Sequence, residues 1–308
     1  MNDEAVPGAG VEPHYAGKTL TLSIANGIAW MTFIQADTLN ALSPAMAQEF
    51  LQACESLSGQ DELKALVLQG SGKAFMAGGD LHALRQDPEA TVAAIIPPMN
   101  QAVLLLQAMP IVIIARLHGA VAGAGLSLAC LADISIAAAE TRFVYAYSDI
   151  ATTCDLGLSW HVVRRLGVSR AIEIALWSRG FDARQAADWG LVNHVVERPR
   201  LDEFVQALIA RLSAMPTHVI RATKTLLLHA QSASLKEQLD LEHSMFLDCA
   251  TRPIFRPRSI SSLRSVGSPS LYPNFVFLPC RPCRCGGRHT GTVNENPDSA
   301  HPAPSVAG

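Results

Sequence analysis

A chain of 308 residues, of which 49% are hydrophobic and 17% charged, is long enough to fold around one large core. The formal net charge is -3 and the Lys and Arg residues are scattered, which excludes an electrostatic surface for nucleic acid. The N-terminus is acidic where a signal peptide needs basic residues, and the longest apolar run, residues 109–117, is too short to span a bilayer. We therefore expect a cytoplasmic protein with no membrane or nucleic-acid partner.

Strands and helices alternate through the first half of the chain. Residues 18–34 alternate apolar and polar side chains around an Asn-Gly pair, which is typical of a β-hairpin. Ser43 and Pro44 then mark a helix start, as N-cap and first helical residue. The further expected elements are a strand at 65–72, a helix at about 94–108, and strands at 111–119, at 134–139 and around FVYAY (143–147). This alternation predicts an α/β fold with a largely parallel sheet.

Helices dominate the second half of the chain. After Gly167 the pattern predicts a helix, a turn, a second helix and a short strand, and three amphipathic helices follow. The pattern ends abruptly near Phe255. The predicted organisation is a flexible N-terminus (1–17), a core (18–195), a C-terminal helical region (196–255) and a disordered or atypical tail (256–308).

The tail is rich in Pro, Ser, Gly and Arg and has no sustained period, which is typical of disorder. Its Cys280, Cys283 and Cys285 lie near His289 but form one Cys-x-x-Cys with no second pair, so they do not predict a metal site. The sudden change of pattern is also consistent with a shifted reading frame or a foreign extension.

Two glycine-rich loops, KAFMAGGDLHAL (73–84) and HGAVAGAGLSLA (118–129), each follow an apolar strand and open a predicted helix. Such a loop presents backbone N–H groups that have no partner within the helix, and two of them together can bind an oxyanion. Neither loop has the spacing of a dinucleotide fingerprint or a phosphate-binding loop. Taken singly, each glycine run is equally explained by close packing.

Together with ARQAADWGLV (183–192), these two motifs resemble the crotonase family, the enoyl-CoA hydratase/isomerase superfamily, over about residues 18–255. The resemblance implies a spiral of repeated strand-strand-helix units with a C-terminal helical region used in trimerisation. It also implies an acyl-CoA thioester as partner, a homotrimer or hexamer, and no cofactor beyond the CoA of the substrate. No metal is expected.

By this resemblance, the backbone N–H groups of Gly79 and Ala124 form an oxyanion hole for the thioester carbonyl. Donors aimed at that oxygen stabilise the enolate formed when a neighbouring proton is removed. The resemblance places Met76 and Ala77 in the substrate pocket. It also assigns Lys73 and Lys224 as contacts for the CoA phosphates, which favour cations. These assignments rest only on the positions of the residues relative to the family motifs.

Asp155 is the predicted catalytic residue. Hydratases of the family use two glutamates, whose positions fall on Ser127 and Tyr147, and neither side chain replaces a carboxylate at neutral pH. Asp155 falls where ring-1,2-epoxyphenylacetyl-CoA isomerases and related enoyl-CoA isomerases carry an aspartate. A carboxylate among apolar neighbours either caps the following helix or does chemistry. The prediction is an enoyl-CoA isomerase that stabilises an enolate and moves a proton through Asp155.

Three alternatives stay open: a hydratase with a non-standard base, a dehalogenase-like hydrolase, and an inactive homologue that binds acyl-CoA. The hydrolase would use Asp155 as a nucleophile, but its activating histidine corresponds to Asn100, which cannot serve as a base. Ser127, Tyr147 and Asn100 are assigned to the substrate pocket. His118, at the end of a strand, is expected to be structural.

Overall fold

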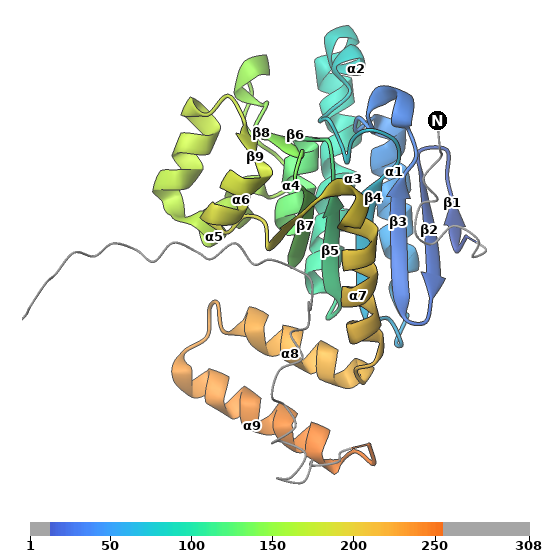
Figure 1. The fold of residues 1–308 in the computed structure, drawn as a ribbon, viewed down its shortest axis with the longest axis vertical. Coiled ribbons are helices and arrows are strands. Elements are labelled where there is room, and N and C mark those ends of the chain that lie inside the picture. The colour runs from blue at the N-terminus through green and yellow to red at the C-terminus, as the bar shows by residue number, and fades with distance from the viewer. Residues whose placement is uncertain (1–12, 255–308) are drawn as a thin grey trace, which may run out of the picture. The chain divides into compact units, whose positions relative to one another are not determined.

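The computed structural model describes residues 13–254, all of which belong to one structural unit (Figure 1). Residues 1–12 and the predicted tail (256–308), with its cysteine cluster, lie outside the described residues. The sheet begins earlier than expected, because Tyr15 and Ala16 already pair with the next strand. The hydroxyl of Tyr15 also bonds Gln52, at 2.9 Å, so the end of the segment expected to be flexible is anchored.

The main sheet has seven strands in the order β1-β2-β3-β4-β5-β7-β10. Strands β1 to β3 are antiparallel and the pairs from β3 to β10 are parallel, which confirms the largely parallel sheet. Its strands are β1 (Tyr15–Ala16), β2 (Leu20–Ala25), β3 (Ile28–Phe33), β4 (Ala65–Gly70), β5 (Val112–Leu117), β7 (Ile134–Ala138) and β10 (His194–Val196). A second sheet holds β6 (Ala120–Ala122), β8 (Arg142–Val144) and β9 (Phe181–Asp182).

Helices follow most strands and then dominate the C-terminal part of the described chain (Figure 1). They are α1 (Pro44–Ser56), α2 (Leu81–Gln86), α3 (Pro88–Ala108), α4 (Ala124–Leu131), α5 (Leu158–Ile172), α6 (Ala183–Trp189), α7 (Leu201–Ser213), α8 (Thr217–His229) and α9 (Leu235–Thr251). A π-helical turn, Glu173–Trp177, extends α5, which is itself kinked at Gly167.

Local signals explain the elements that were predicted well. The turn of the hairpin places Asn26 and Gly27 at positive φ, the geometry that favours an Asn-Gly pair. Ser43 caps α1 by accepting a hydrogen bond from the Met46 amide at 3.2 Å. Helix α3 starts at Pro88, several residues before the predicted start, because the Asp87 side chain accepts from the backbone ahead of it.

Side chains along β5 point alternately to the two faces of the main sheet, and each face packs against different helices. Ile113, Ala115 and Leu117 belong to the main apolar core, which α1 and α3 cover. Arg116 points to the other face and pairs with Asp202 of α7, and Figure 1 shows α7 crossing that face. The sheet is therefore covered on both sides, as expected for parallel strands.

Helix α3 is long and apolar enough to cross a membrane by length and composition alone, and no other helix of the described chain meets that test. It packs against α1, and Met99, Ala102 and Leu106 on it are fully buried in the core. In the part of the chain that the structure describes, helix α9 buries no side chain and leaves Leu235 and Phe246 exposed.

Candidate active site

The two glycine-rich loops lie side by side. The Met76 amide donates to the Ala120 carbonyl (3.2 Å), and the Ala122 amide donates to the Met76 carbonyl (2.9 Å). The approach is so close that a Cβ on Gly125 would lie 2.3 Å from the Met76 carbonyl oxygen. Glycine is therefore required there for steric reasons, and the first residue of α4 is held close to the first loop.

The predicted oxyanion donors lie at the start of α4 and at the end of the first loop. In the part of the chain that the structure describes, the backbone N–H groups of Gly79 and Ala124 donate no hydrogen bond. Gly78, with φ of 113°, and Gly123, with φ of 49°, aim the chain just before each donor. A Cβ on Gly123 would lie 3.3 Å from the Gly78 Cα, so the two donors belong to adjacent backbone segments. Open donors in this arrangement suit a carbonyl oxygen that gains negative charge.

Two buried polar side chains anchor the first loop. Asn40, which is fully buried, donates through Nδ2 to the carbonyls of Ser71 (3.0 Å) and Ala74 (2.9 Å). His118 donates through Nε2 to the Gly72 carbonyl at 3.0 Å. The structural role expected for His118 is supported by this contact, whereas Asn40 was missed because its neighbours indicate only a turn before a helix.

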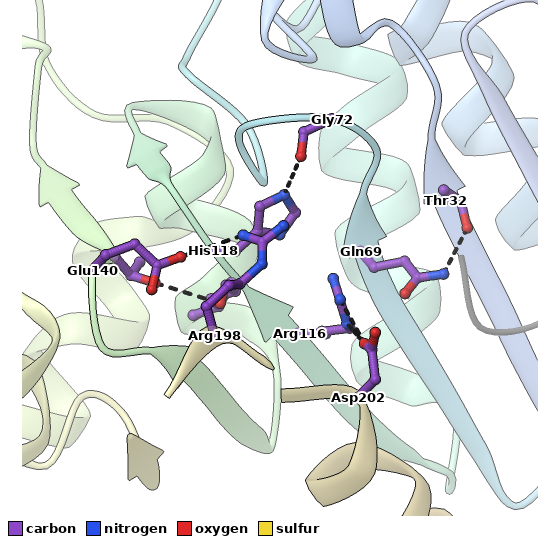
Figure 2. A network of polar contacts seen from close by, with 10 residues as sticks. Thr32, Gln69, Gly72, Arg116, His118, Glu140, Arg198 and Asp202 are labelled. Carbon is purple, nitrogen blue, oxygen red and sulfur yellow. Dashed lines mark hydrogen bonds and ion pairs between the residues drawn. The ribbon is translucent and has the colours of Figure 1, made fainter. Parts of the chain in front are cut away.

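Burial and then the charges of Arg198 and Arg116 lower the pKa of His118 to about 3. The imidazole is therefore neutral at physiological pH, and its buried Nδ1 has no hydrogen-bond partner among the described residues. Figure 2 shows this histidine with Gly72 and the neighbouring ion pairs Arg116–Asp202 and Arg198–Glu140.

The Asp155 cluster comprises Ser127, Tyr147 and Asp155. The Tyr147 hydroxyl donates to Asp155 Oδ1 at 2.5 Å, and Ser127 Oγ lies 2.9 Å from the same hydroxyl. Because Tyr147 gives its single hydroxyl proton to the carboxylate, Ser127 is the donor in its contact with Tyr147. Ser127 Oγ also lies 3.3 Å from the main-chain oxygen of Asp155. The structure thus brings three predicted residues into direct contact.

Burial raises the pKa of the Asp155 carboxyl, and the hydrogen bond from Tyr147 partly opposes that rise. Burial, followed by the nearby Asp155 charge, raises the pKa of Tyr147 far above its ordinary value. Tyr147 therefore stays protonated and acts as a donor at neutral pH. Asp155 remains partly exposed, so a substrate can reach it.

The capping alternative for Asp155 is wrong. The N-cap of α5 is Gly157, and no side chain of residues 13–254 caps this helix. Asp155 contributes only its main-chain oxygen, which accepts from the Leu158 amide at 3.0 Å. Leu156 and Gly157 both have positive φ, so the chain turns sharply and leaves the carboxylate pointing to Tyr147 instead of along the helix.

The remaining predicted pocket and CoA residues have different surroundings. Met76 is fully buried between the two loops, and Ala77 is half-buried beside them, with its amide bonded to the Leu39 carbonyl. Asn100 is exposed on α3, and its assignment to the pocket stays a prediction. Lys73 is exposed and stays a prediction.

The assignment of Lys224 to CoA phosphates is corrected by the structure. Its side chain is buried, with Nζ 2.6 Å from the Ile111 carbonyl and 2.8 Å from Asp133 Oδ2. The same Asp133 oxygen accepts from the Ile113 amide at 2.7 Å. Lys224 therefore uses its charge to join α8 to the sheet.

An apolar pocket of about 260 Å³ is lined by residues of α4 and α5 and by neighbours in the chain of the Asp155 cluster. Leu126, Tyr145 and Cys154 line it, and each lies next to or near a member of the cluster in the chain. The Tyr145 hydroxyl interacts with Cys154, and burial together with this contact raises the pKa of Tyr145 to about 12. The sequence pattern gave no signal for this cavity, because the same apolar residues are expected in a filled core. Among residues 13–254, no group of three His, Cys, Asp or Glu side chains could hold a metal ion.

Comparison with known proteins identifies the family. The enoyl-CoA hydratase/isomerase family model matches residues 23–259. The chain is 30% identical to 1,2-epoxyphenylacetyl-CoA isomerase of Escherichia coli over 223 residues, which is 71% of this chain and 85% of that protein. It is 33% identical to a probable enoyl-CoA hydratase of Rhodobacter capsulatus over 227 residues, 73% of this chain and 86% of the relative.

A solved structure agrees with this result. A Thermobifida fusca protein assigned as an enoyl-CoA hydratase, crystallised with CoA, superposes with a TM-score of 0.68 at 30% identity. The match covers 75% of this chain and 92% of that one. The chain therefore belongs to the enoyl-CoA hydratase/isomerase family, and the crotonase-like α/β fold predicted from the sequence is confirmed.

Proposed function

We propose that this protein is an enoyl-CoA isomerase that moves a carbon–carbon double bond of an acyl-CoA thioester through Asp155. The observation that carries the proposal is a single, partly exposed carboxylate, hydrogen-bonded on one oxygen, in a fold that also presents two open backbone donors. The resemblance to an epoxyphenylacetyl-CoA isomerase and to a protein solved with CoA supports the substrate class.

The reaction is a 1,3-proton transfer. The thioester carbonyl accepts hydrogen bonds from the Gly79 and Ala124 N–H groups, and the Asp155 carboxylate takes a proton from C2 of a 3-enoyl-CoA. The electrons of that C–H bond form the enolate, whose oxygen is stabilised by the two donors. Asp155 then gives its proton to C4, the C3–C4 double bond moves to C2–C3, and the carboxylate is regenerated.

Hydration is disfavoured by the two hydroxyl side chains of the cluster. Ser127 and Tyr147 are neutral groups already engaged with Asp155, and the pKa of Tyr147 is raised by burial and by that charge. A hydratase with a single working carboxylate would have to bind and activate water with Asp155 alone. The hydrolase alternative is weakened because Asn100, at the position of the activating histidine, cannot serve as a base. An inactive acyl-CoA binder is the contrasting outcome.

Cofactor use, cellular location and oligomeric state are also part of the proposal. We infer that no cofactor is needed beyond the CoA of the substrate, and that the protein works in the cytoplasm as a homotrimer or hexamer. The exposed apolar side chains of α8 and α9, Leu227, Leu235, Leu239 and Phe246, support association. Light scattering after size exclusion tests it, and a monomer at micromolar concentration would contradict it.

The proposed function is tested by identifying the product. Purified protein is mixed with a 3-enoyl-CoA, and separately with a 2-enoyl-CoA, while absorbance of the conjugated thioester is followed and products are separated chromatographically. We expect the conjugated 2-enoyl-CoA to accumulate in the first reaction and the 2-enoyl-CoA to persist in the second. Formation of a 3-hydroxyacyl-CoA would indicate a hydratase, and the absence of turnover in both would indicate a binder.

A further inference from the structure

The Asp155 carboxylate is held from one side. Its Oδ1 accepts the short bond from Tyr147, and in the described chain no other side chain bonds either carboxylate oxygen. Tyr147 is itself buried, with 6% of its surface exposed, whereas Asp155 is only partly covered. One carboxylate oxygen is thus fixed against the protein and the other, Oδ2, is left for a ligand.

The backbone next to both residues is in an unusual conformation. Ala146, directly before Tyr147, has φ of 59°, and Leu156, directly after Asp155, has φ of 51°. L-residues other than glycine rarely adopt such angles, because the Cβ approaches the backbone closely. Leu156 is nevertheless buried in the core, so the surrounding packing holds this turn. Two strained turns therefore aim the two side chains of the short hydrogen bond at each other.

Ser127 ties this arrangement to α4. The serine is fully buried, and its hydroxyl contacts the Tyr147 hydroxyl and, at 3.4 Å, the Gly123 carbonyl. Gly123 is the residue before Ala124, whose amide is one of the open donors. The same buried hydroxyl therefore contacts the Asp155 cluster and the turn that aims an oxyanion donor.

We propose that Tyr147, supported by Ser127, is a positioning residue that holds Oδ1 of Asp155 so that Oδ2 alone exchanges the proton with the substrate. This inference rests on the proposed isomerase function. In the first step the C2–H bond breaks and an Oδ2–H bond forms; in the second the Oδ2–H bond breaks and a C4–H bond forms. Tyr147 keeps its own proton throughout, and no other reactant is required.

The pH profile distinguishes positioning from simple packing. Asp155 must be ionised to accept the proton, so kcat rises with pH through the pKa of Asp155. The Tyr147 hydrogen bond lowers that pKa, and Tyr147→Phe should therefore move the acidic limb of the profile to higher pH. We expect kcat to fall roughly 10- to 100-fold because the carboxylate is no longer oriented, with KM changed little.

Other titratable groups face the cluster and need their own variants. Tyr145 and Cys154 lie beside it, and His161 of α5 approaches Gly157, where a Cβ would lie 3.5 Å from its Nε2. Helix α3 faces the same glycine with the apolar Val103, and α4 contributes the uncharged Ser127. Burial and then Arg165 and Arg164 lower the pKa of His161 to about 4, so His161→Gln tests whether it contributes to the acidic limb.

Tyr145→Phe is the matched control. It removes the same hydroxyl from a ring that contacts Tyr147, with centroids 5.1 Å apart. The Tyr145 hydroxyl bonds Cys154; it feels the charge of Asp155, but no hydrogen bond between described residues joins it to that carboxylate. Its pH profile should match the wild type. Ser127→Ala, which keeps both tyrosines, should move the acidic limb in the same direction as Tyr147→Phe by a smaller amount.

The experiment compares pH–kcat profiles of the wild type, Tyr147→Phe, Ser127→Ala, Tyr145→Phe and His161→Gln with a 3-enoyl-CoA. An unchanged acidic limb in both Tyr147→Phe and Ser127→Ala would overturn the inference, as would an equal shift in Tyr145→Phe. If Tyr147→Phe does not fold, Ser127→Ala decides alone. Asp155→Asn distinguishes a failure of the proposed function from a failure of this inference. Activity that survives in Asp155→Asn contradicts the isomerase mechanism. Loss of activity in Asp155→Asn, with no shift of the acidic limb in Tyr147→Phe and Ser127→Ala, contradicts only the positioning role.

Discussion

Replacing Gly125 with alanine should push the two glycine-rich loops apart. The new Cβ would lie 2.3 Å from the Met76 carbonyl oxygen and 2.9 Å from the Met76 Cβ. A carbon–oxygen contact needs about 3.3 Å, so one loop must move by about 1 Å. The carbonyl cannot turn away freely, because it accepts the Ala122 amide at 2.9 Å.

The magnitude follows from two opposing terms. Alanine is favoured over glycine inside a helix by about 1 kcal/mol, and overpacking costs about 1–3 kcal/mol. We therefore expect a net loss of about 1 kcal/mol in the free energy of unfolding. A displacement of about 1 Å between the two oxyanion donors should also reduce kcat by roughly 100-fold.

Urea unfolding followed by circular dichroism, together with isomerase kinetics, measures both effects. Gly79→Ala is the matched control for stability, because its Cβ would first meet Leu84 at 3.8 Å, an ordinary contact, and this variant should unfold like the wild type. A Gly125→Ala protein as stable as the wild type and fully active would refute the argument from close approach. Helix propensity alone predicts the opposite change, a gain in the free energy of unfolding for Gly125→Ala.

Two further predictions concern the polar contacts. Lys224→Met should lower the free energy of unfolding by about 2 kcal/mol, because it leaves Asp133 without its buried partner. Binding of CoA, measured by calorimetry, should stay unchanged. Weaker CoA binding with unchanged stability would instead support the assignment of Lys224 to the CoA phosphates. His118 is held neutral when folded, with its pKa lowered to about 3, but titrates near 6.5 when unfolded. Below pH 6.5 protons therefore favour the unfolded chain, and stability falls by up to about 1.4 kcal/mol per pH unit until the pH approaches 3. His118→Asn should remove that part of the acid sensitivity in urea titrations at pH 7, 6 and 5, and an unchanged slope would count against a neutral His118.

Elements marked by local chemistry were predictable from the sequence. The Asn26-Gly27 turn and the Ser43 cap each depend on residues adjacent in the chain, and both appear in the structure. The start of α3 was predicted several residues late, although Asp87 and Pro88 are an N-cap and a first-turn proline of the same kind as Ser43 and Pro44. The expected strand around FVYAY ends at Val144, since the turn at Ala146 diverts the chain.

The sequence motifs predicted which segments form the site, but they did not predict the side-chain contacts within it. The adjacency of the two loops depends on glycines that the motifs contain, whereas the bond between Tyr147 and Asp155 depends on two left-handed residues that no local pattern signals. Lys224 was misassigned for a related reason. An amphipathic helix shows which residues are charged, but its partner Asp133 is 91 positions away in the sequence.

The role of Asp155 is tested most directly by the rate of the Asp155→Asn variant with a 3-enoyl-CoA. Asparagine keeps the size of the side chain but cannot accept the proton, so we expect a loss of kcat of at least about 10³-fold with nearly unchanged affinity for a CoA ligand. Asp149→Asn, an exposed carboxylate in the same segment, should retain wild-type kinetics and serves as the control. An Asp155→Asn enzyme that retains wild-type kcat would show that Asp155 does not carry the proton.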